Sequence, residues 1–322
     1  MVPSSVDKLS ETERSLRTVS PGSLGTGPSN DGARRIVSCM HIARHESGIG
    51  GAVRALASQI HPVFMLPPVA ASAFGAVLAG FSSPGLALLH VATAFVALYT
   101  AHVKDGYVDF YHRGEDDDHP LTAVGCRLAL VGSTALFVAG TVAIGVLVGP
   151  LAALLTLPGW LFGYLHAPYL DTNPVTATMG YPLGIGFALL GGYYVQAESL
   201  SATVLAFAVV FVAILSGIKT IDDSKDYEYD RSIDKRTVAV VLGRRRARTA
   251  AFAVMMLGLV AAVGFVVVRA FPPSAVFAPL SFAVVAAFAA RGDDELATML
   301  LIRGSYVFLA VLVVAVWFHP LS

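Results

Sequence analysis

Apolar stretches long enough to cross a bilayer recur along the chain from residue 62 almost to its end. A transmembrane helix needs about 20 predominantly apolar residues. Nine segments come close to or exceed that length, at roughly 62 to 82, 86 to 104, 124 to 147, 150 to 168, 177 to 197, 201 to 221, 248 to 269, 273 to 290 and 298 to 318. The pattern predicts an all-α, polytopic membrane protein with nine transmembrane helices.

The composition agrees with this pattern. The chain is 55% hydrophobic and only 14% charged, and its mean hydropathy is +0.68, which lies outside the range of ordinary soluble domains. A net charge of zero argues against a nucleic-acid partner. The two cysteines, Cys39 and Cys126, support neither a disulfide framework nor a cysteine metal site.

Charged residues are distributed unevenly between the two ends of these segments. All Lys and Arg residues except Arg269 lie in the N-terminal segment, in alternate connections or beside them, and Glu198 is the one carboxylate assigned to the other side. By the positive-inside rule, the N-terminus and the connections that follow the second, sixth and eighth segments are cytoplasmic. An odd number of spans places the C-terminus outside. The positive-inside rule concerns Lys and Arg, so carboxylates gathered on the same face indicate a polar site there.

The N-terminal region differs from the rest of the chain. Residues 1–45 are rich in Ser, Gly, Arg and Glu and show no apolar periodicity, which predicts a disordered cytoplasmic tail. Residues 46–322 would then form the membrane domain. The basic run Arg244, Arg245, Arg246 and Arg248 at the start of the seventh segment favours contact with anionic membrane lipid.

The strongest chemical signal follows the sixth segment. Asp222, Asp226 and Asp230 recur every fourth residue, so on a continuous helix they share one face. Carboxylates in such a row repel one another unless cations lie between them. Mg²⁺ in proteins is typically bound by one or two carboxylates together with substrate phosphates.

A second acidic cluster follows the second segment, on the same side of the membrane. Asp105 and Asp109 are again four residues apart, and the run Glu115 to Asp118, which follows, is typical of a solvated loop. A helix bundle that brought the two clusters together would bracket a metal-bound diphosphate. Side chains that could contact its phosphate oxygens are Lys225, Arg231, Lys235 and His102.

These residues resemble the UbiA superfamily of intramembrane prenyltransferases. The second cluster matches that family's D-x-x-x-D-x-x-x-D motif, and the stretch Asp234 to Gly243 is similar to its G-K-R-T-x-A-V-x-L-G continuation. The first cluster departs from the family's N-x-x-x-D-x-x-x-D pattern, because Asp105 stands at the Asn position and Arg113 replaces the last Asp. Tyr164 and Pro168 resemble the family's Y-x-x-P-P segment, but Asp171 lies where a basic residue is expected.

The resemblance implies nine helices around a central cavity and a Mg²⁺-dependent enzyme of isoprenoid biosynthesis. It would transfer an isoprenyl chain from a polyprenyl diphosphate, such as geranylgeranyl diphosphate, to a lipophilic acceptor within the membrane. By the same resemblance, Asp105, Asp109, Asp222, Asp226 and Asp230 would hold the metal. Tyr164 would stabilise the allylic cation through its ring face.

Two other functions remain open at this point. A membrane terpene cyclase of the same superfamily would capture the cation with a double bond of its own chain, and the altered first motif is compatible with it. A transporter also gathers intramembrane carboxylates. A carrier, however, is expected to carry charges on both gates, whereas the outer half of this sequence is almost free of them.

Overall fold

The protein is described by a computed structural model that covers residues 41–320. Every regular element in that range is helical, and a single isolated bridge pairs Ala43 with Leu121. The α-helices are α2 (Gly48–Ala57), α3 (Pro62–Leu78), α4 (Pro84–Val108), α5 (Ala123–Leu147), α6 (Pro150–Leu165), α7 (Pro174–Ala197), α8 (Ala202–Lys225), α9 (Tyr227–Ser232), α10 (Val238–Leu242), α11 (Arg244–Val267), α12 (Phe277–Ala289) and α13 (Asp294–Phe318). Cys39 and residues 1–40 of the expected tail lie outside the described residues.

The all-α prediction is confirmed for the described residues, and each of the nine apolar segments contains a helix. Six of these helices, α4, α5, α7, α8, α11 and α13, are long and apolar enough to cross a membrane. A seventh span results if α2 and α3, which meet at a bend of 67°, are counted together. Helices α6 and α12 are shorter, with 16 and 13 residues. The count of nine spans is therefore not established by helix length within residues 41–320.

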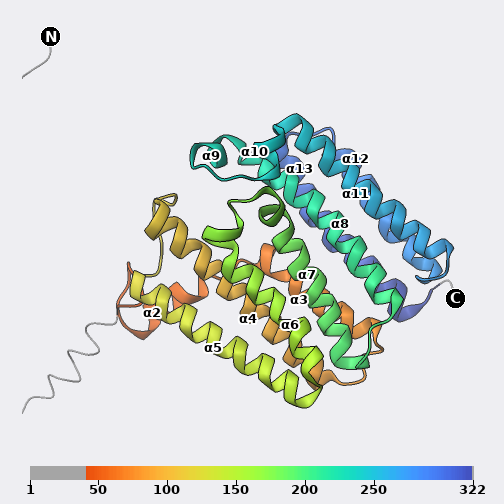
Figure 1. Ribbon diagram of the computed structural model, residues 1–322, viewed down its shortest axis with the longest axis horizontal. Coiled ribbons are helices and arrows are strands. Elements are labelled where there is room, and N and C mark those ends of the chain that lie inside the picture. The colour runs from red at the N-terminus through yellow and green to blue at the C-terminus, as the bar shows by residue number, and fades with distance from the viewer. Residues whose placement is uncertain (1–40, 321–322) are drawn as a thin grey trace, which may run out of the picture. The chain divides into compact units, whose positions relative to one another are not determined.

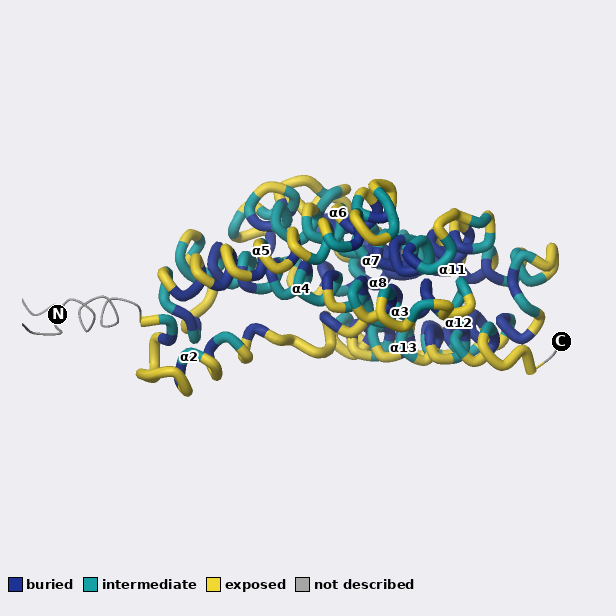
Figure 2. Tube along the Cα trace, turned by 90° about the horizontal axis from the view of Figure 1, so that it is seen from below, coloured by how far each residue is buried: buried dark blue, intermediate teal, exposed yellow. Residues whose placement is uncertain are grey.

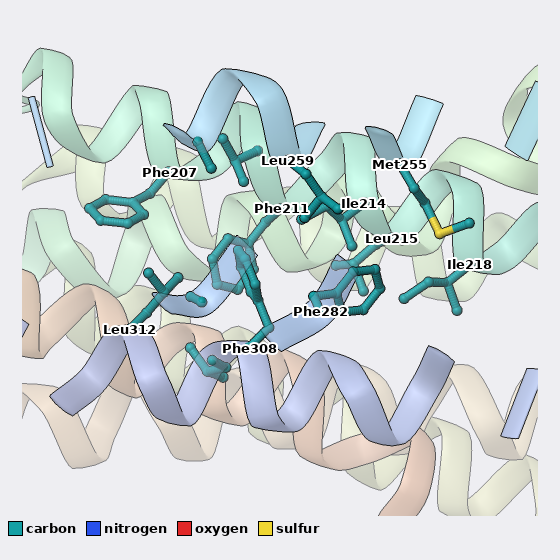
Figure 3. Close-up of a cluster of buried hydrophobic side chains, with 14 of the residues drawn as sticks. Phe207, Phe211, Ile214, Leu215, Ile218, Met255, Leu259, Phe282, Phe308 and Leu312 are labelled. Carbon is teal, nitrogen blue, oxygen red and sulfur yellow. The ribbon is translucent and has the colours of Figure 1, made fainter. Parts of the chain in front are cut away.

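Helix α8 forms the centre of the packing. In its most apolar window 72% of the residues are buried, against 17% for α5, and Figure 2 shows the same contrast between the two helices. Phe207, Phe211 and Ile214 of α8 belong to one buried apolar cluster with Met255 of α11 and Phe308 of α13 (Figure 3). Figure 1 shows α11 running alongside α8 over most of its length. Large apolar side chains on α5 and α11 are exposed, as expected of surfaces that face lipid.

Glycines allow α3 and α7 to lie against each other with almost no side chain between them. A Cβ atom at Gly192 would collide with the carbonyl group of Ser72, and one at Gly75 would collide with the carbonyl oxygen of Leu189. Small residues permit this close backbone approach between membrane helices. The contact joins the first half of the bundle to its centre.

Three helices change their geometry at the ends that carry or adjoin the acidic clusters. A π-helical turn, η1 (Asp109–Arg113), continues α4, and a second one, η2 (His166–Leu170), continues α6. Helix α8 ends at Lys225, and Asp226 separates it from α9. Short π-helical turns inside α-helices often occur at functional sites. The two acidic clusters of the sequence fall at two of these three ends.

The glycine contact between α3 and α7 gives a stability test. Gly192→Ala should lower the free energy of unfolding by ~1–3 kcal/mol, because the added methyl group meets backbone that cannot move away without separating the helices. Thermal melting in detergent measures the effect. Gly264→Ala on α11 is the control, because its Cβ would meet nothing within 4 Å. Equal melting temperatures for the two variants would show that the contact between α3 and α7 is looser than described.

Candidate functional site

A pocket of about 810 Å³ lies among helices α3, α4, α6, α7, α8 and α13. One end of the pocket carries the acidic side chains Asp105, Asp109 and Asp222. Further from this end its walls are apolar, as shown by Leu98 and Ile185. The pocket therefore joins a charged mouth to an apolar interior.

The two acidic clusters meet at this mouth. Asp105 and Asp109 come from the end of α4, and Asp222 comes from the last turn of α8. Lys235, in the segment between α9 and α10, lies within electrostatic reach of both Asp105 and Asp109. Segments that are more than 100 residues apart in the sequence thus supply charges to one opening.

The row Asp222, Asp226 and Asp230 does not share one continuous helix face, contrary to the prediction. The helix ends at Lys225, Asp226 is half exposed, and Asp230 on α9 is buried. One helical hydrogen bond survives across the break, since the N–H of Asp230 donates to the carbonyl oxygen of Asp226 at 2.8 Å. Of the three aspartates, only Asp222 lines the pocket.

Lysines neutralise the carboxylates at the end of α8. Lys219 forms an ion pair with the buried Asp223 and lies 3.7 Å from Asp222. The ammonium group of Lys225 lies 3.3 Å from Asp222 and 3.5 Å from Asp226. Because Lys219 also lines the pocket, a cation is present at the mouth in addition to the carboxylates.

Arg113 gathers the carboxylates at the ends of α4 and α6. Its Nη2 lies 2.6 Å from Asp171 Oδ2, and its Nη1 lies 3.3 Å from Asp109 Oδ1 and 3.5 Å from Glu115 Oε1. Arg113 is, with Asp105, one of the two departures from the family pattern in the first motif, and Asp171 is the departure in the segment after α6. Two of the three departures, Arg113 and Asp171, are therefore direct ionic partners.

The segment after α8 adds a further ion pair at the mouth. Lys235 Nζ lies 3.1 Å from Glu115 Oε2. Burial lowers the pKa of Lys235, but Asp109 and Glu115 raise it by more, so its pKa lies above the usual value. Burial also raises the pKa of Asp230 to about 6, an effect that Lys235 opposes. A carboxyl group in this position ionises more readily when a cation is near.

Several other expected site residues lie away from the pocket lining. The ring of Tyr164 stacks on Trp160, with Lys104 Nζ 5.4 Å from its centroid, and Tyr164 is not among the lining residues. Arg231 is exposed. His102 does line the pocket, its ring centroid is 5.1 Å from that of His61, and its Nδ1 is buried with no hydrogen-bond partner among the described residues.

The structure adds residues that the sequence reasoning did not select. Glu115 is buried in ion pairs, so the expectation of a solvated loop is wrong at that position, and Asp116 and Asp118 line the pocket. Lys219 lies three and four residues before Asp222 and Asp223, a spacing at which helical side chains meet. That spacing could have identified Lys219. No local signal links Asp171 to Arg113.

The donor set at the mouth suits a hard divalent cation. All the candidate ligands are carboxylate oxygens, and Asp105 lines the pocket next to Asp109. Within residues 41–320, no three or more His, Cys, Asp or Glu side chains are arranged as a complete metal-ligand group. Mg²⁺ does not need such a cage, because it is usually held by one or two carboxylates plus water and substrate phosphates. The residues present therefore fit a Mg²⁺ ion that a diphosphate helps to bind.

Comparison with known proteins gives a consistent result. The model of the UbiA prenyltransferase family matches residues 65–298. The 1,4-dihydroxy-2-naphthoate octaprenyltransferase of Mycobacterium tuberculosis is 31% identical over 252 residues, which cover 71% of this chain and 83% of the relative.

Solved structures share the fold. A digeranylgeranylglyceryl phosphate synthase matches with a TM-score of 0.64 at 15% identity, over 82% of this chain and 99% of the other. A UbiA homologue from Archaeoglobus fulgidus bound to GPP and Mg²⁺ matches with a TM-score of 0.56 at 18% identity, over 83% of this chain and 99% of the other. With a family model that spans most of the sequence, the chain belongs to the UbiA prenyltransferase family and is a prenyltransferase.

Proposed function

We propose that this enzyme uses Mg²⁺ to transfer an isoprenyl chain of about geranylgeranyl length from its diphosphate to a lipophilic acceptor in the membrane. The observation that carries the proposal is the pocket, which has Asp105, Asp109 and Asp222 at its mouth and apolar walls below them. An allylic diphosphate has the same division between a charged head and an apolar chain.

The mouth would bind the diphosphate. Asp105, Asp109 and Asp222 would hold Mg²⁺, with Asp226 and Asp230 next to them on the broken helix end. When bound, Mg²⁺ neutralises charge on the leaving diphosphate. Lysines supply further positive charge for phosphate oxygens: Lys219 at the pocket wall, Lys225 beside Asp222, and Lys235 across the mouth.

The interior would protect the cation that forms when the diphosphate leaves. Its walls exclude water, which would otherwise trap an allylic cation before the acceptor reacts. Phe162 and Tyr181 line the pocket, and aromatic faces attract a nearby cation. Tyr164 stays a prediction for this role, because its ring faces Lys104. The acceptor then forms a bond to the allylic carbon and loses a proton.

The depth of the pocket supports a donor of geranylgeranyl length. Along α4 the lining residues run from Asp105 to His90, a distance of about 22 Å at 1.5 Å per residue. With carbon–carbon bonds near 1.5 Å, each extended isoprenyl repeat adds roughly 4–5 Å. Four repeats fill this depth, whereas the eight repeats of an octaprenyl chain would have to fold back or leave the pocket.

His90 would form the floor. It is almost fully buried, and its Nδ1 lies 2.7 Å from the hydroxyl oxygen of Ser72. Gly191 of α7 leaves room for its Nε2, which has no hydrogen-bond partner among the described residues. Higher up the same helix, Gly180 and Gly184 line the pocket without any neighbour that a Cβ would touch. These glycines keep the path to the floor open.

The orientation follows from the charges. We infer that α3 to α8 and α11 to α13 each cross the membrane, with the N-terminus and the acidic mouth cytoplasmic and the C-terminus outside. The tail 1–45 would precede this domain, although Ala43, near its end, pairs with Leu121.

An activity assay tests the reaction. Purified protein is incubated with Mg²⁺ and geranylgeranyl diphosphate, with and without acceptors that include 1,4-dihydroxy-2-naphthoate and glycerol lipids, and pyrophosphate and lipid products are measured. Asp105→Asn and Asp226→Ala should lower turnover about 100-fold or more, because charge stabilisation of the leaving group is lost. Asp117→Asn, a change at an exposed acid of the same cytoplasmic face, should not.

The products separate the alternatives. Pyrophosphate release that needs an acceptor supports transfer, and a hydrocarbon made without any acceptor would show a cyclase instead. Full turnover in Asp105→Asn would contradict the proposal that the acidic mouth binds Mg²⁺ and the diphosphate. An enzyme that is inactive with every allylic diphosphate would contradict the proposed reaction.

Donor length has its own test. Gly184→Phe should lower kcat/KM for geranylgeranyl diphosphate about tenfold or more while sparing geranyl diphosphate, because the new ring fills the lower half of the pocket. Gly264→Phe is the matched control, since that position on α11 is exposed and open. An unchanged kcat/KM for geranylgeranyl diphosphate, or an equal loss for both donors, would contradict this path of the chain past Gly184.

Labelling tests the orientation. In a Cys39→Ser, Cys126→Ser background, Ser199→Cys between α7 and α8 should react with a membrane-impermeant maleimide on intact cells. Ser232→Cys at the end of α9 should react only after lysis, since both positions are exposed but on opposite sides. The reverse pattern would invert the proposed topology.

A further inference from the structure

Arg113 makes an unusual number of ionic contacts for one side chain. Its two terminal nitrogens face carboxylates from three positions, with Nη2 toward Asp171 and Nη1 toward Asp109 and Glu115. The planar guanidinium fixes the directions of its N–H groups, so contacts on both nitrogens define its orientation. Lysine, a point charge on a flexible side chain, could not make the same contacts with the three carboxylates.

The partners of Arg113 are largely withdrawn from water. The side chains of Glu115 and Asp171 are only 5% and 6% exposed, and that of Asp109 is 17% exposed. A buried carboxylate without a partner is strongly unfavourable. Asp171 pairs with Nη2 of Arg113, the nitrogen that does not face Asp109 and Glu115. It follows η2 at the end of α6, where its N–H donates to the carbonyl oxygen of His166. Its position is therefore set by backbone as well as by charge.

The contacts tie together three separate parts of the mouth. Arg113 ends η1 after α4, and Asp171 follows η2 after α6. Glu115 extends the chain of contacts to Lys235, which lies beyond α8. Gly114, in a left-handed conformation (φ 65°), turns the chain so that Glu115 lies next to Arg113 again. The contacts thus link the ends of α4 and α6 to each other and, through Lys235, to the segment between α9 and α10.

We propose that Arg113 is a positioning residue for the cation and diphosphate site, with Asp171 as the counter-ion that fixes its orientation. Arg113 contacts Asp109 through Oδ1, which orients the carboxylate and leaves Oδ2 for a divalent cation. Arg113 acts through Asp109 and need not touch the substrate. This inference deepens the proposed function and rests on it, because it concerns how the same mouth binds a metal and a diphosphate.

Cation binding without turnover tests the inference. Mn²⁺ replaces Mg²⁺ as a spectroscopic probe, and its binding to the purified protein is measured by electron paramagnetic resonance with inorganic pyrophosphate present. Arg113→Lys keeps the positive charge but loses the planar guanidinium group. Asp171→Asn keeps the shape of the side chain but loses its negative charge. Both variants should weaken Mn²⁺ binding about tenfold or more, the range typical of substitutions at residues that hydrogen-bond to a metal ligand.

A second ion pair gives a matched control. Arg248 and Asp294 join the cytoplasmic ends of α11 and α13, with side chains 22% and 23% exposed. Arg248→Lys and Asp294→Asn should leave Mn²⁺ binding unchanged. Thermal melting of all four variants, without ligands, reports how much each pair contributes to stability alone.

The outcomes separate this inference from the function on which it rests. If Arg113→Lys and Asp171→Asn bind Mn²⁺ as tightly as the wild type and differ only in a lower melting temperature, the ion pair stabilises the fold and does not position the site. That result would overturn this inference but not the proposed function. A wild-type protein that binds neither Mn²⁺ nor pyrophosphate would overturn the proposed function and this inference with it. Weakened binding in these two variants, with intact binding in the controls, supports both.

Discussion

Neutralisation of buried carboxylates is the constraint on which the acidic end of this protein depends. Glu115, Asp171 and Asp223 are almost inaccessible to water, and a buried charge without a partner costs several kcal/mol. Asp223 pairs with Lys219 of its own helix. Asp171 pairs with Arg113 from the end of α4, and Glu115 pairs with Lys235 in addition to the nearby Arg113. The ends of α4 and α6 and the segment after α8 must therefore meet for Asp171 and Glu115 to be paired in this way. The mouth of the pocket is the place where they meet.

The interior is held together by apolar packing instead of ion pairs. Helix α8 is enclosed by aromatic and aliphatic side chains (Figure 3), and α3 approaches α7 closely through Gly75 and Gly192. Further along α7, Gly180 and Gly184 line the pocket, and a Cβ at either position would meet no neighbour. Small residues on α7 thus serve both the close contact with α3 and the open space of the pocket.

The sequence predicts those features that depend on local patterns. Apolar runs locate the helices, because a bilayer demands about 20 such residues in succession. The four-residue spacing of the acids singles out Asp105, Asp109 and Asp222, which line one pocket, but also Asp226 and Asp230, which do not. The break at Asp226 and the burial of Glu115 escape this reasoning. The ion pair between Glu115 and Lys235 joins residues that are distant in sequence, and local periodicity carries no information about such a contact.

The pair Arg113 and Asp171 shows why departures from a motif should not be judged one at a time. An arginine in place of a carboxylate would, by itself, leave a cation surrounded by fewer anions, and an aspartate in place of a base would leave a buried anion. Each change alone is unfavourable. At a separation of 2.6 Å the two charges compensate each other. The altered first motif is therefore compatible with the same acidic site, because the cation that it introduces is already paired.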